Sequence, residues 1–324
     1  MPFLSGPEAD PSPEGSSSQE VLVSGEGAGR RGGRFWSGFS LAVLFGVISF
    51  LLWWLCAWAL QHEPWIENEL MWTVFSLFPA ALATTVLLLR LGGWPSLAAI
   101  GAPLNWQAWR EVLQGLFLGT GIGLVVIGIQ YVAGWVTFEA ASDSLLRGGE
   151  GAFFWAPPIG LGIAVLALGS AGEELLFRGY GLQQLIRATS PWVAVAVTSL
   201  IFGLMHASNP DASAPGIANT GLFGALFGLA LVRLRSWWTP FGMHFGWNAT
   251  LATIGANVSG LRIKLAGLAL TPNGPPLWTG GDYGPEGSLL TSFAVVAAGY
   301  IVWKLPAGRP DPRLWDKDIP GLSS

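Results

Sequence analysis

Two neighbouring glutamates, Glu173 and Glu174, are the residues of this sequence best placed to do chemistry. They stand in the stretch SAGEELLFRGYG, and of the twenty acidic residues only these two fall inside, or at the edge of, an apolar run long enough to cross a bilayer. Two of the three histidines, His206 and His244, also end or lie within apolar runs, whereas His62 lies in a polar stretch. Ionisable groups at membrane depth are rare and usually functional. The sequence therefore predicts one polar site built from several apolar segments.

Helical spacing predicts partners within these segments. Glu174 and Arg178 are four residues apart and share a helix face, so we expect an ion pair between them. Glu173 is turned about 100° away from Glu174 and lacks that partner. A free and partly desolvated carboxylate should have a raised pKa suited to general-base work. His244 and Asn248 are likewise four apart and should point the same way.

The distances along the chain indicate which groups can meet. Phe202 stands one turn before His206 and can wall the same face. Glu173 lies 17 residues before Ser190 and His206 lies 16 after it, so two antiparallel helices turning there would place both about 24 Å from the turn. His244 is much nearer the next turn. Bringing it level requires the hairpin to protrude, or to tilt, by about 14 Å, and GLQQLIRATS is polar enough to protrude as an extension of the helix.

One carboxylate, two imidazoles and a carboxamide support several chemistries. In one, Glu173 with His206 activates a water that attacks a peptide carbonyl. His244 and Asn248 then donate hydrogen bonds to the oxyanion, each worth about 3–4 kcal/mol. In another, Glu173, His206 and His244 bind a divalent metal such as zinc and leave one position open. The metalloprotease signature H-E-x-x-H is absent, so these ligands would come from different helices.

Two further interpretations stay open at this point. The two histidines can be axial ligands of a haem between helices, although the pair of glutamates would then have no role. The protein can also be an ion- or proton-coupled transporter, although no inverted repeat is apparent. A cysteine nucleophile is not indicated, because Cys56, the single cysteine, is remote from these segments.

Composition fixes the broad class. The chain is 51% hydrophobic and 11% charged, whereas soluble domains are about 25% charged. This predicts an integral membrane protein. Residues 1–34 lack the apolar core of a signal peptide and are expected to form a disordered cytoplasmic tail, and residues 306–324 a second one. No nucleotide-binding loop and no nucleic-acid partner are indicated.

Apolar windows predict an all-α, polytopic bundle of about eight transmembrane helices around an intramembrane cavity. The domain spans residues 35–305, and residues 152–258 carry the motifs. The predicted spans lie near Phe35–Leu60, Met71–Leu91, Val112–Trp135, Phe154–Phe177, Trp192–Ala207, Ile217–Leu234, Trp237–Val258 and Gly287–Leu305. With the N-terminus inside, twelve Lys and Arg residues fall on the inner side and three on the outer side, so both termini should be cytoplasmic.

Small residues recur on two of these spans. Gly115, Gly119 and Gly123 follow one another every four residues, and Gly224 with Gly228 repeats the spacing. Such stripes usually let helix backbones approach closely.

Three motifs in order resemble a known family. EELLFR, from Glu173 to Arg178, matches E-E-x-x-x-R; FGLMH, ending at His206, matches F-x-x-x-H; and HFGWN, from His244 to Asn248, matches H-x-x-x-N/D. The chain resembles the CAAX-protease and bacteriocin-processing family (CPBP, or Abi) of intramembrane endopeptidases, which includes the type II CAAX prenyl proteases. The stretch WTGGDYGPEGS also resembles a loop of many bacterial members.

The resemblance implies cleavage of a peptide bond in a membrane-associated protein or peptide, in an eight-helix fold within a bacterial inner membrane. It implies Glu173 as water activator and His206 as its partner. His244 and Asn248 would be the oxyanion stabilisers. The supporting residues would be Glu174, Arg178 and Phe202. The family is labelled metalloprotease, but a metal-free glutamate mechanism has been argued for its prenyl-protein branch. A transporter, or a catalytically silent membrane binding or immunity protein, is the alternative.

Overall fold

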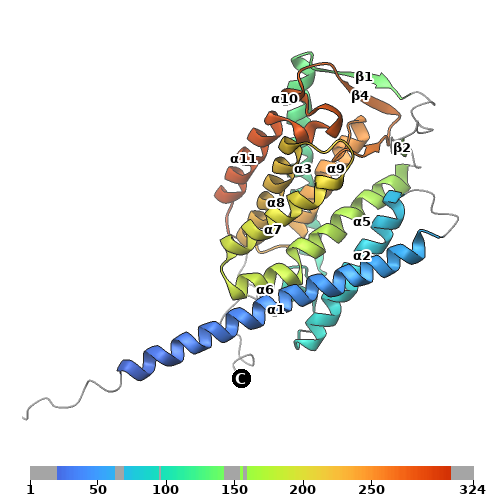
Figure 1. Cartoon of the computed structure of the whole chain (residues 1–324). Coiled ribbons are helices and arrows are strands. Elements are labelled where there is room, and N and C mark those ends of the chain that lie inside the picture. The colour runs from blue at the N-terminus through green and yellow to red at the C-terminus, as the bar shows by residue number, and fades with distance from the viewer. Residues whose placement is uncertain (1–19, 63–68, 95, 142–153, 156–158, 308–324) are drawn as a thin grey trace, which may run out of the picture.

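The computed structural model describes residues 20–62, 69–94, 96–141, 154–155 and 159–307 (Figure 1). Its main helices are α1 (Glu20–Leu60), α2 (Glu69–Leu91), α3 (Trp106–Val132), α5 (Ile159–Arg178), α6 (Tyr180–Ala188), α7 (Pro191–Met205), α8 (Ala214–Leu234), α9 (Trp238–Ile254) and α11 (Leu289–Lys304). The shorter elements are β1 (Val136–Ala140), β2 (Phe154–Trp155), β3 (Arg262–Ile263), β4 (Leu268–Pro272), α10 (Pro276–Thr279), and the 3-10 turns η1 (Leu97–Ile100), η2 (His206–Ser208), η3 (Gly281–Tyr283) and η4 (Pro285–Gly287).

The described residues contain six segments long and apolar enough to cross a membrane, the fourth of which joins α5 and α6. The chain is a polytopic helical membrane protein with little sheet, as predicted. The two remaining predicted spans correspond to α9 and α11, which have 17 and 16 residues, so the count of eight stays a prediction. The domain limits also stay a prediction, although α1 begins at Glu20, inside the segment expected to be a disordered tail.

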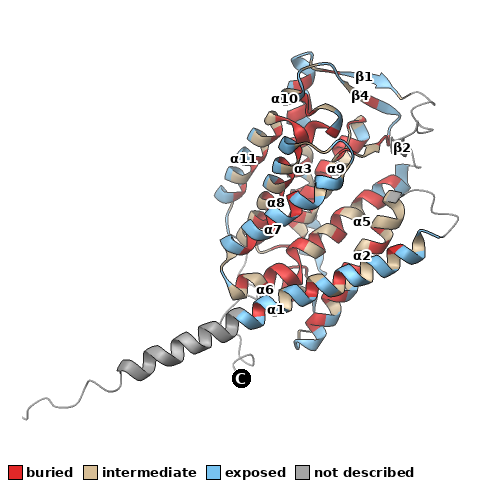
Figure 2. Cartoon of the chain, in the orientation of Figure 1, coloured by how far each residue is buried: buried red, intermediate tan, exposed pale blue. Residues whose placement is uncertain are grey.

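The helices form two groups that meet at α5 (Figure 1). In one group α1 packs against α2 and α6. In the other, α3 packs against α9, and α8 packs against α7, α9 and α11. Helix α5 contacts α2 on one side and α9 on the other. Apolar side chains along α1, including Phe50, Leu51 and Trp54, are exposed, as expected of a helix that faces lipid (Figure 2).

Helices α3 and α9 approach each other through glycines. A Cβ atom on Gly119 would overlap the main-chain oxygen of Met243, and one on Gly115 would overlap that of Thr239. From the other side, a Cβ on Gly246 would come within 2.6 Å of the Leu116 oxygen. The expected role of the glycine stripe in close helix packing is therefore confirmed. Without a hydrophobic driving force between helices in lipid, this backbone contact is what fixes α9 on α3.

The predicted protruding extension of the fourth span is wrong. The helix breaks at Gly179, where a Cβ would overlap the Leu175 oxygen, and α6 starts as a separate helix. Helix α6 packs along α1 and buries Leu182, Gln183 and Ile186 instead of projecting. The amide of Gln183 points into the protein, where its Nε2 donates to the main-chain oxygen of Ile100. The fourth span also starts later than predicted, because residues 154–155 form strand β2.

One end of the bundle carries the strands, and we call it the strand end (Figure 1). Strands β1 and β4 pair antiparallel, from Val136 with Pro272 to Ala140 with Leu268. Strands β2 and β3 pair in parallel. The short helices α10, η3 and η4 lie in the same connection between α9 and α11. Within this connection β4 contacts α9, and η4 contacts α8 and α11.

Candidate active site

Three helices bring the predicted site residues together. Glu173 and Glu174 lie in the last two turns of α5, His206 caps the C-terminus of α7, and His244 lies in the middle of α9. Oε2 of Glu173 is 3.9 Å from Nε2 of His206 and 3.7 Å from Nε2 of His244. Both imidazoles therefore present the same nitrogen to the same carboxylate oxygen. The predicted level alignment of Glu173 with His206 is confirmed.

Glu174 is engaged inside the protein, in contrast to Glu173. Its Oε1 accepts hydrogen bonds from Nη1 of Arg178 at 3.0 Å and from Nδ1 of His244 at 2.9 Å. Glu174 and Arg178 are 0% and 1% exposed, so this ion pair is almost unscreened by solvent. The predicted pairing of Glu174 with Arg178 is confirmed. The bond to His244 joins α5 to α9 across 70 positions of sequence, and the spacing along the chain did not predict it.

The guanidinium of Arg178 is held among aromatic rings. It lies 4.6 Å from the ring centroid of Phe202, 5.4 Å from that of Phe227 and 5.7 Å from that of Phe177. Its Nη2 also donates to the main-chain oxygen of Gly224 at 3.0 Å. Cation–π contacts of this kind strengthen when water is excluded. Arg178 thus fixes Glu174 while touching α7 and α8 as well.

The orientation of His206 is set by its own helix. Its Nδ1 lies 2.8 Å from the Phe202 oxygen, and an N–H at Nδ1 donates to that carbonyl. Nε2 is then the unprotonated nitrogen of the neutral ring, and it faces Glu173. The Phe202 ring packs 4.8 Å from the His206 ring, in agreement with the predicted wall. The His244 ring is held similarly by stacking on Phe227, with centroids 5.1 Å apart.

Glu173 is the ionisable group that the site leaves free. Its side chain is 28% exposed, and its Oε2 is buried without a hydrogen-bond partner among the described residues. Asn248 lies one turn beyond His244, as predicted. Its Nδ2 makes one long contact, 3.4 Å, to Oγ of the buried Ser170. A weak bond of this length leaves the amide available to a ligand.

The donor types at this site match those of a divalent metal site. One carboxylate and two imidazoles with engaged Nδ1 atoms are a common zinc ligand set. Among the described residues, however, no group of three or more His, Cys, Asp or Glu is placed so that it could hold a metal ion.

Several buried polar contacts to α9 come from residues that the motifs do not include. Trp237 Nε1 donates to the Glu174 main-chain oxygen at 3.1 Å, at the start of the helix. Trp247, between His244 and Asn248, donates from Nε1 to Oε1 of Glu286 at 2.6 Å. The carboxylate of Glu286 is 4% exposed. The burial of Glu286 could not be predicted from its place in a turn-rich segment, although the glycines and prolines around it indicated an ordered turn.

The fold and this site define a polytopic helical membrane protein in which two carboxylates and two imidazoles converge, with Glu174 and His244 buried and Glu173 and His206 partly exposed. A family model described as Rce1-like, type II CAAX prenyl endopeptidase, matches residues 155–250. The match contains all three motifs from Glu173 to Asn248, so the resemblance to the CPBP family is confirmed. The family implies a CAAX-type intramembrane protease. No curated protein and no solved structure matches the chain.

Proposed function

We propose that the protein is an intramembrane endopeptidase in which Glu173 activates the hydrolytic water. The observation that carries this proposal is the contrast between the two glutamates. Oε1 of Glu174 has Arg178 and His244 as partners, whereas Oε2 of Glu173 has no hydrogen-bond partner among the described residues and faces two Nε2 atoms. A general base must be free to accept a proton and must be held in place, and Glu173 meets both requirements.

The hydrolysis needs one proton to move twice. A water bound to Glu173 Oε2 gives up a proton to this carboxylate while its oxygen bonds to the scissile carbonyl carbon. Nε2 of His206, 3.9 Å from Glu173 Oε2, accepts the second hydrogen bond of that water and orients it. The C–N bond then breaks as protonated Glu173 returns its proton to the leaving nitrogen. The products are a carboxylic acid and an amine, and Glu173 is again ionised. The acid then gives its remaining proton to the released amine or to water and leaves as a carboxylate.

The tetrahedral intermediate requires hydrogen-bond donors for its oxyanion. We assign His244 Nε2 and Asn248 Nδ2 to this role. His244 Nε2 lies 3.7 Å from Glu173 Oε2, and Asn248 follows one turn later on α9, where it contacts Ser170 of α5. Since Nδ1 of His244 already donates to Glu174, donation from Nε2 requires both ring nitrogens to carry protons. Glu174, itself held by Arg178, is the anion that balances such an imidazolium. This explains why a second carboxylate stands directly after the base.

The substrate class is a membrane-associated protein or peptide, as the name of the matched family suggests. The family description names a CAAX prenyl endopeptidase. For a bacterial inner-membrane protein with both termini in the cytoplasm, the alternative substrate is a peptide or bacteriocin precursor. The proposal requires only that the scissile bond reach Glu173, whose side chain is 28% exposed.

A metal-assisted form of the proposal uses Glu173, His206 and His244 as ligands of zinc or another divalent ion. Such an ion would supply Lewis acidity and a more acidic water. Elemental analysis of the purified protein separates the two forms. One equivalent of metal in the wild type that is lost in Glu173→Gln, with activity abolished by chelation and restored by zinc, would assign the metal. Full activity after exhaustive chelation would rule out the metal-assisted form.

Comparison of peptide termini in strains that carry the wild type or Glu173→Gln tests the proposed function. The matched control is Glu139→Gln, on the exposed strand β1. We expect termini that are present with the wild type and Glu139→Gln but absent with Glu173→Gln. Identical termini in all three strains, at equal expression, would contradict proteolysis. Solute uptake into liposomes that survives Glu173→Gln would instead favour a transporter, and neither signal would favour a silent binding protein.

A further inference from the structure

Glu286 is a buried carboxylate that the proposed chemistry does not use. It is 4% exposed, and the described residues include no cation paired with it. A buried charge of this kind is costly unless its oxygens are fully hydrogen-bonded. Both oxygens are: Oε1 accepts from Trp247 Nε1 and Oε2 accepts from Ser259 Oγ, each at 2.6 Å. The bond to Trp247 connects Glu286 to the helix that carries His244, and the bond to Ser259 connects it to the turn that carries His206.

The first bond reaches α9. Trp247 is 1% exposed and lies between His244 and Asn248 in the helix. Its ring packs 4.7 Å from that of Phe223 on α8, and a Cβ on Gly123 of α3 would lie 3.7 Å from its Cε3. The indole is therefore enclosed by two helices, and its N–H is anchored by Glu286. Rotation of α9 would break this bond and turn the His244 ring relative to Glu173.

The second bond reaches the turn that follows α7. Ser259 donates to Glu286 through Oγ, and its main-chain oxygen accepts from Asn209 Nδ2 at 3.0 Å. Asn209 is the residue that ends η2, which begins at His206. Ser259 holds a left-handed backbone with φ of 49°, a conformation that non-glycine residues adopt at a cost. The two hydrogen bonds of Ser259 offset that cost and tie the His206 turn to Glu286.

The connection that carries Glu286 is itself rigid. Asn219 of α8 donates from Nδ2 to the main-chain oxygens of Glu286 and Ser288, at 2.7 and 2.8 Å. Gly284 has φ of 103°, and a Cβ there would overlap the Asn257 oxygen, so the turn requires glycine. Burial, together with the nearby charge of Glu286, raises the pKa of Tyr283 to about 12, and the neutral hydroxyl lies 3.3 Å from Thr220 Oγ1.

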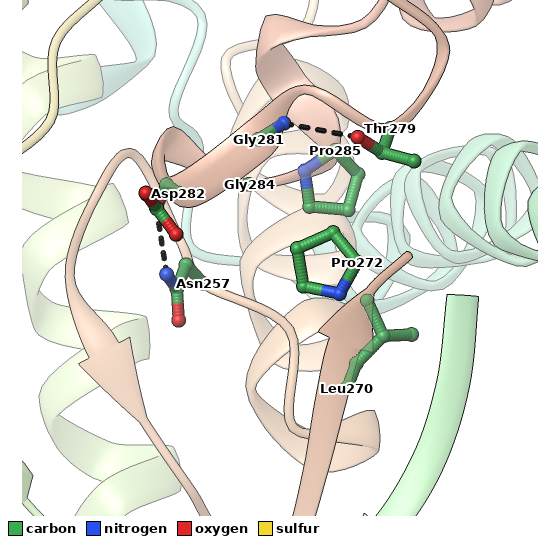
Figure 3. Close-up of a pocket in the computed structure, with 8 residues that line it drawn as sticks. All are labelled: Asn257, Leu270, Pro272, Thr279, Gly281, Asp282, Gly284 and Pro285. Carbon is green, nitrogen blue, oxygen red and sulfur yellow. Dashed lines mark hydrogen bonds between the residues drawn. The ribbon is translucent and has the colours of Figure 1, made fainter. Parts of the chain in front are cut away.

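The exposed side of the same connection holds a small pocket lined by Leu270, Pro272, Thr279 and Pro285 (Figure 3). Asn257 donates to the Asp282 oxygen at its rim, and Gly281 donates to the Thr279 hydroxyl. These contacts shape the outer surface of the connection. They lead to neither histidine, and so they provide matched controls.

We propose that Glu286 is a positioning residue that fixes His244 and His206 relative to Glu173 through its bonds to Trp247 and Ser259. The inference rests on the proposed function for its catalytic consequence, but the positioning itself can be measured without a substrate. Glu286 lies outside the matched family segment 155–250, which contains the three motifs. The strand end thus completes a site whose reacting groups all lie in the helices.

Protein labelled with ¹⁵N-histidine and reconstituted in liposomes provides the direct test. The chain has three histidines, so each ring can be assigned separately. The ring ¹⁵N chemical shifts report tautomer and hydrogen bonding for each one, and His→Gln variants assign them. We expect Glu286→Ala to shift the His206 and His244 signals and to leave His62 unchanged. Unchanged His206 and His244 signals in a folded Glu286→Ala protein would overturn the inference.

The matched variant Glu286→Gln separates positioning from charge. Its amide oxygen can accept from Trp247 and its NH₂ can donate to Ser259 Oγ, so the signals should return to the wild-type positions. If Gln shifted them as much as Ala, the effect would be electrostatic and the positioning role would be refuted. Should Glu286→Ala fail to fold, Trp247→Phe is expected to shift His244 alone and Ser259→Ala to shift His206 alone. Equal effects of the two would refute the two-arm arrangement.

Kinetics provide the link to activity. We expect Glu286→Ala to lower kcat by about 10- to 100-fold with KM unchanged, because a displacement of about 1 Å in a catalytic group can cost 100-fold. Asn257→Ala, which alters the same connection without reaching a histidine, should keep the wild-type kcat. A wild type that cleaves nothing would refute the proposed function while the ¹⁵N measurement still decides the positioning role.

Discussion

Replacing Arg178 with methionine should destabilise the protein more than most single substitutions. The change removes the guanidinium that Glu174 Oε1 faces at 3.0 Å and leaves a carboxylate that is 0% exposed. Removing one partner of a buried ion pair costs about 3–5 kcal/mol, because the remaining charge stays desolvated. The bond from Arg178 to the Gly224 oxygen is lost as well. We expect the free energy of unfolding to fall by about 3–5 kcal/mol.

A double-mutant cycle with Glu174→Gln shows whether the pair carries this effect. The double variant has no buried unpaired charge at this position, so it should be less destabilised than the two single variants together. Coupling between contacting residues is about 0.5–3 kcal/mol, and we expect a value in the upper half of this range. Arg178→Lys should not rescue Arg178→Met, because an ammonium cannot reproduce the planar fork on Glu174 and Gly224.

The assay is SDS titration of the reconstituted protein, followed by far-UV circular dichroism. The exposed pair Gln107 and Glu111, which are hydrogen-bonded at 2.9 Å, provides a surface control. Gln107→Ala should change the free energy of unfolding by less than about 0.5 kcal/mol. A destabilisation of similar size for Arg178→Met, or strict additivity in the cycle, would refute the claim that this buried ion pair stabilises the protein.

Three further predictions follow from the same contacts. Gly119→Ala should lower the free energy of unfolding by about 1–3 kcal/mol, because its Cβ would overlap the Met243 oxygen, whereas Gly121→Ala meets no atom within 4 Å and should be neutral in the SDS titration. Asn248→Ala should lower kcat by about 10²–10³, as for loss of one oxyanion donor, and Asn273→Ala on the exposed strand end should leave it unchanged in the same peptide assay. Burial and the nearby Arg262 lower the pKa of Lys264 from 10.5 to about 8, so the unfolded chain binds more protons between these values. The free energy of unfolding should therefore rise with pH across this window. Lys264→Met should abolish this rise when the free energy of unfolding is measured from pH 7 to 11.

The sequence predicted those parts of the site that depend on spacing within one helix. The facing of Glu174 and Arg178, the freedom of Glu173 and the wall made by Phe202 all follow from a period of 3.6 residues. The bond between Glu174 and His244 depends on the rotation of α5 relative to α9, which no local pattern encodes. For the same reason the role of Trp237 at the start of α9 was not predicted.

Two features of the fold were missed for different physical reasons. The break at Gly179 was hidden because GLQQLIRATS has the composition of a helix, and only the pair of glycines around Tyr180 indicated an interruption. The burial of Glu286 was hidden because a loop glutamate is normally solvated. In each case tertiary packing decided a conformation that local propensity left open.

The most direct test of the central claim, that Glu173 activates the hydrolytic water, is a single-turnover reaction in ¹⁸O-labelled water. Wild type, Glu173→Gln and the control His62→Gln are reconstituted in liposomes with a peptide cleaved in the wild-type strain. Mass spectrometry follows both the rate and the new C-terminus. We predict one ¹⁸O atom in the new carboxylate, a rate about 10²–10⁴ lower for Glu173→Gln, and a wild-type rate for His62→Gln. Equal rates for the wild type and Glu173→Gln, or a new C-terminus without ¹⁸O, would contradict the account.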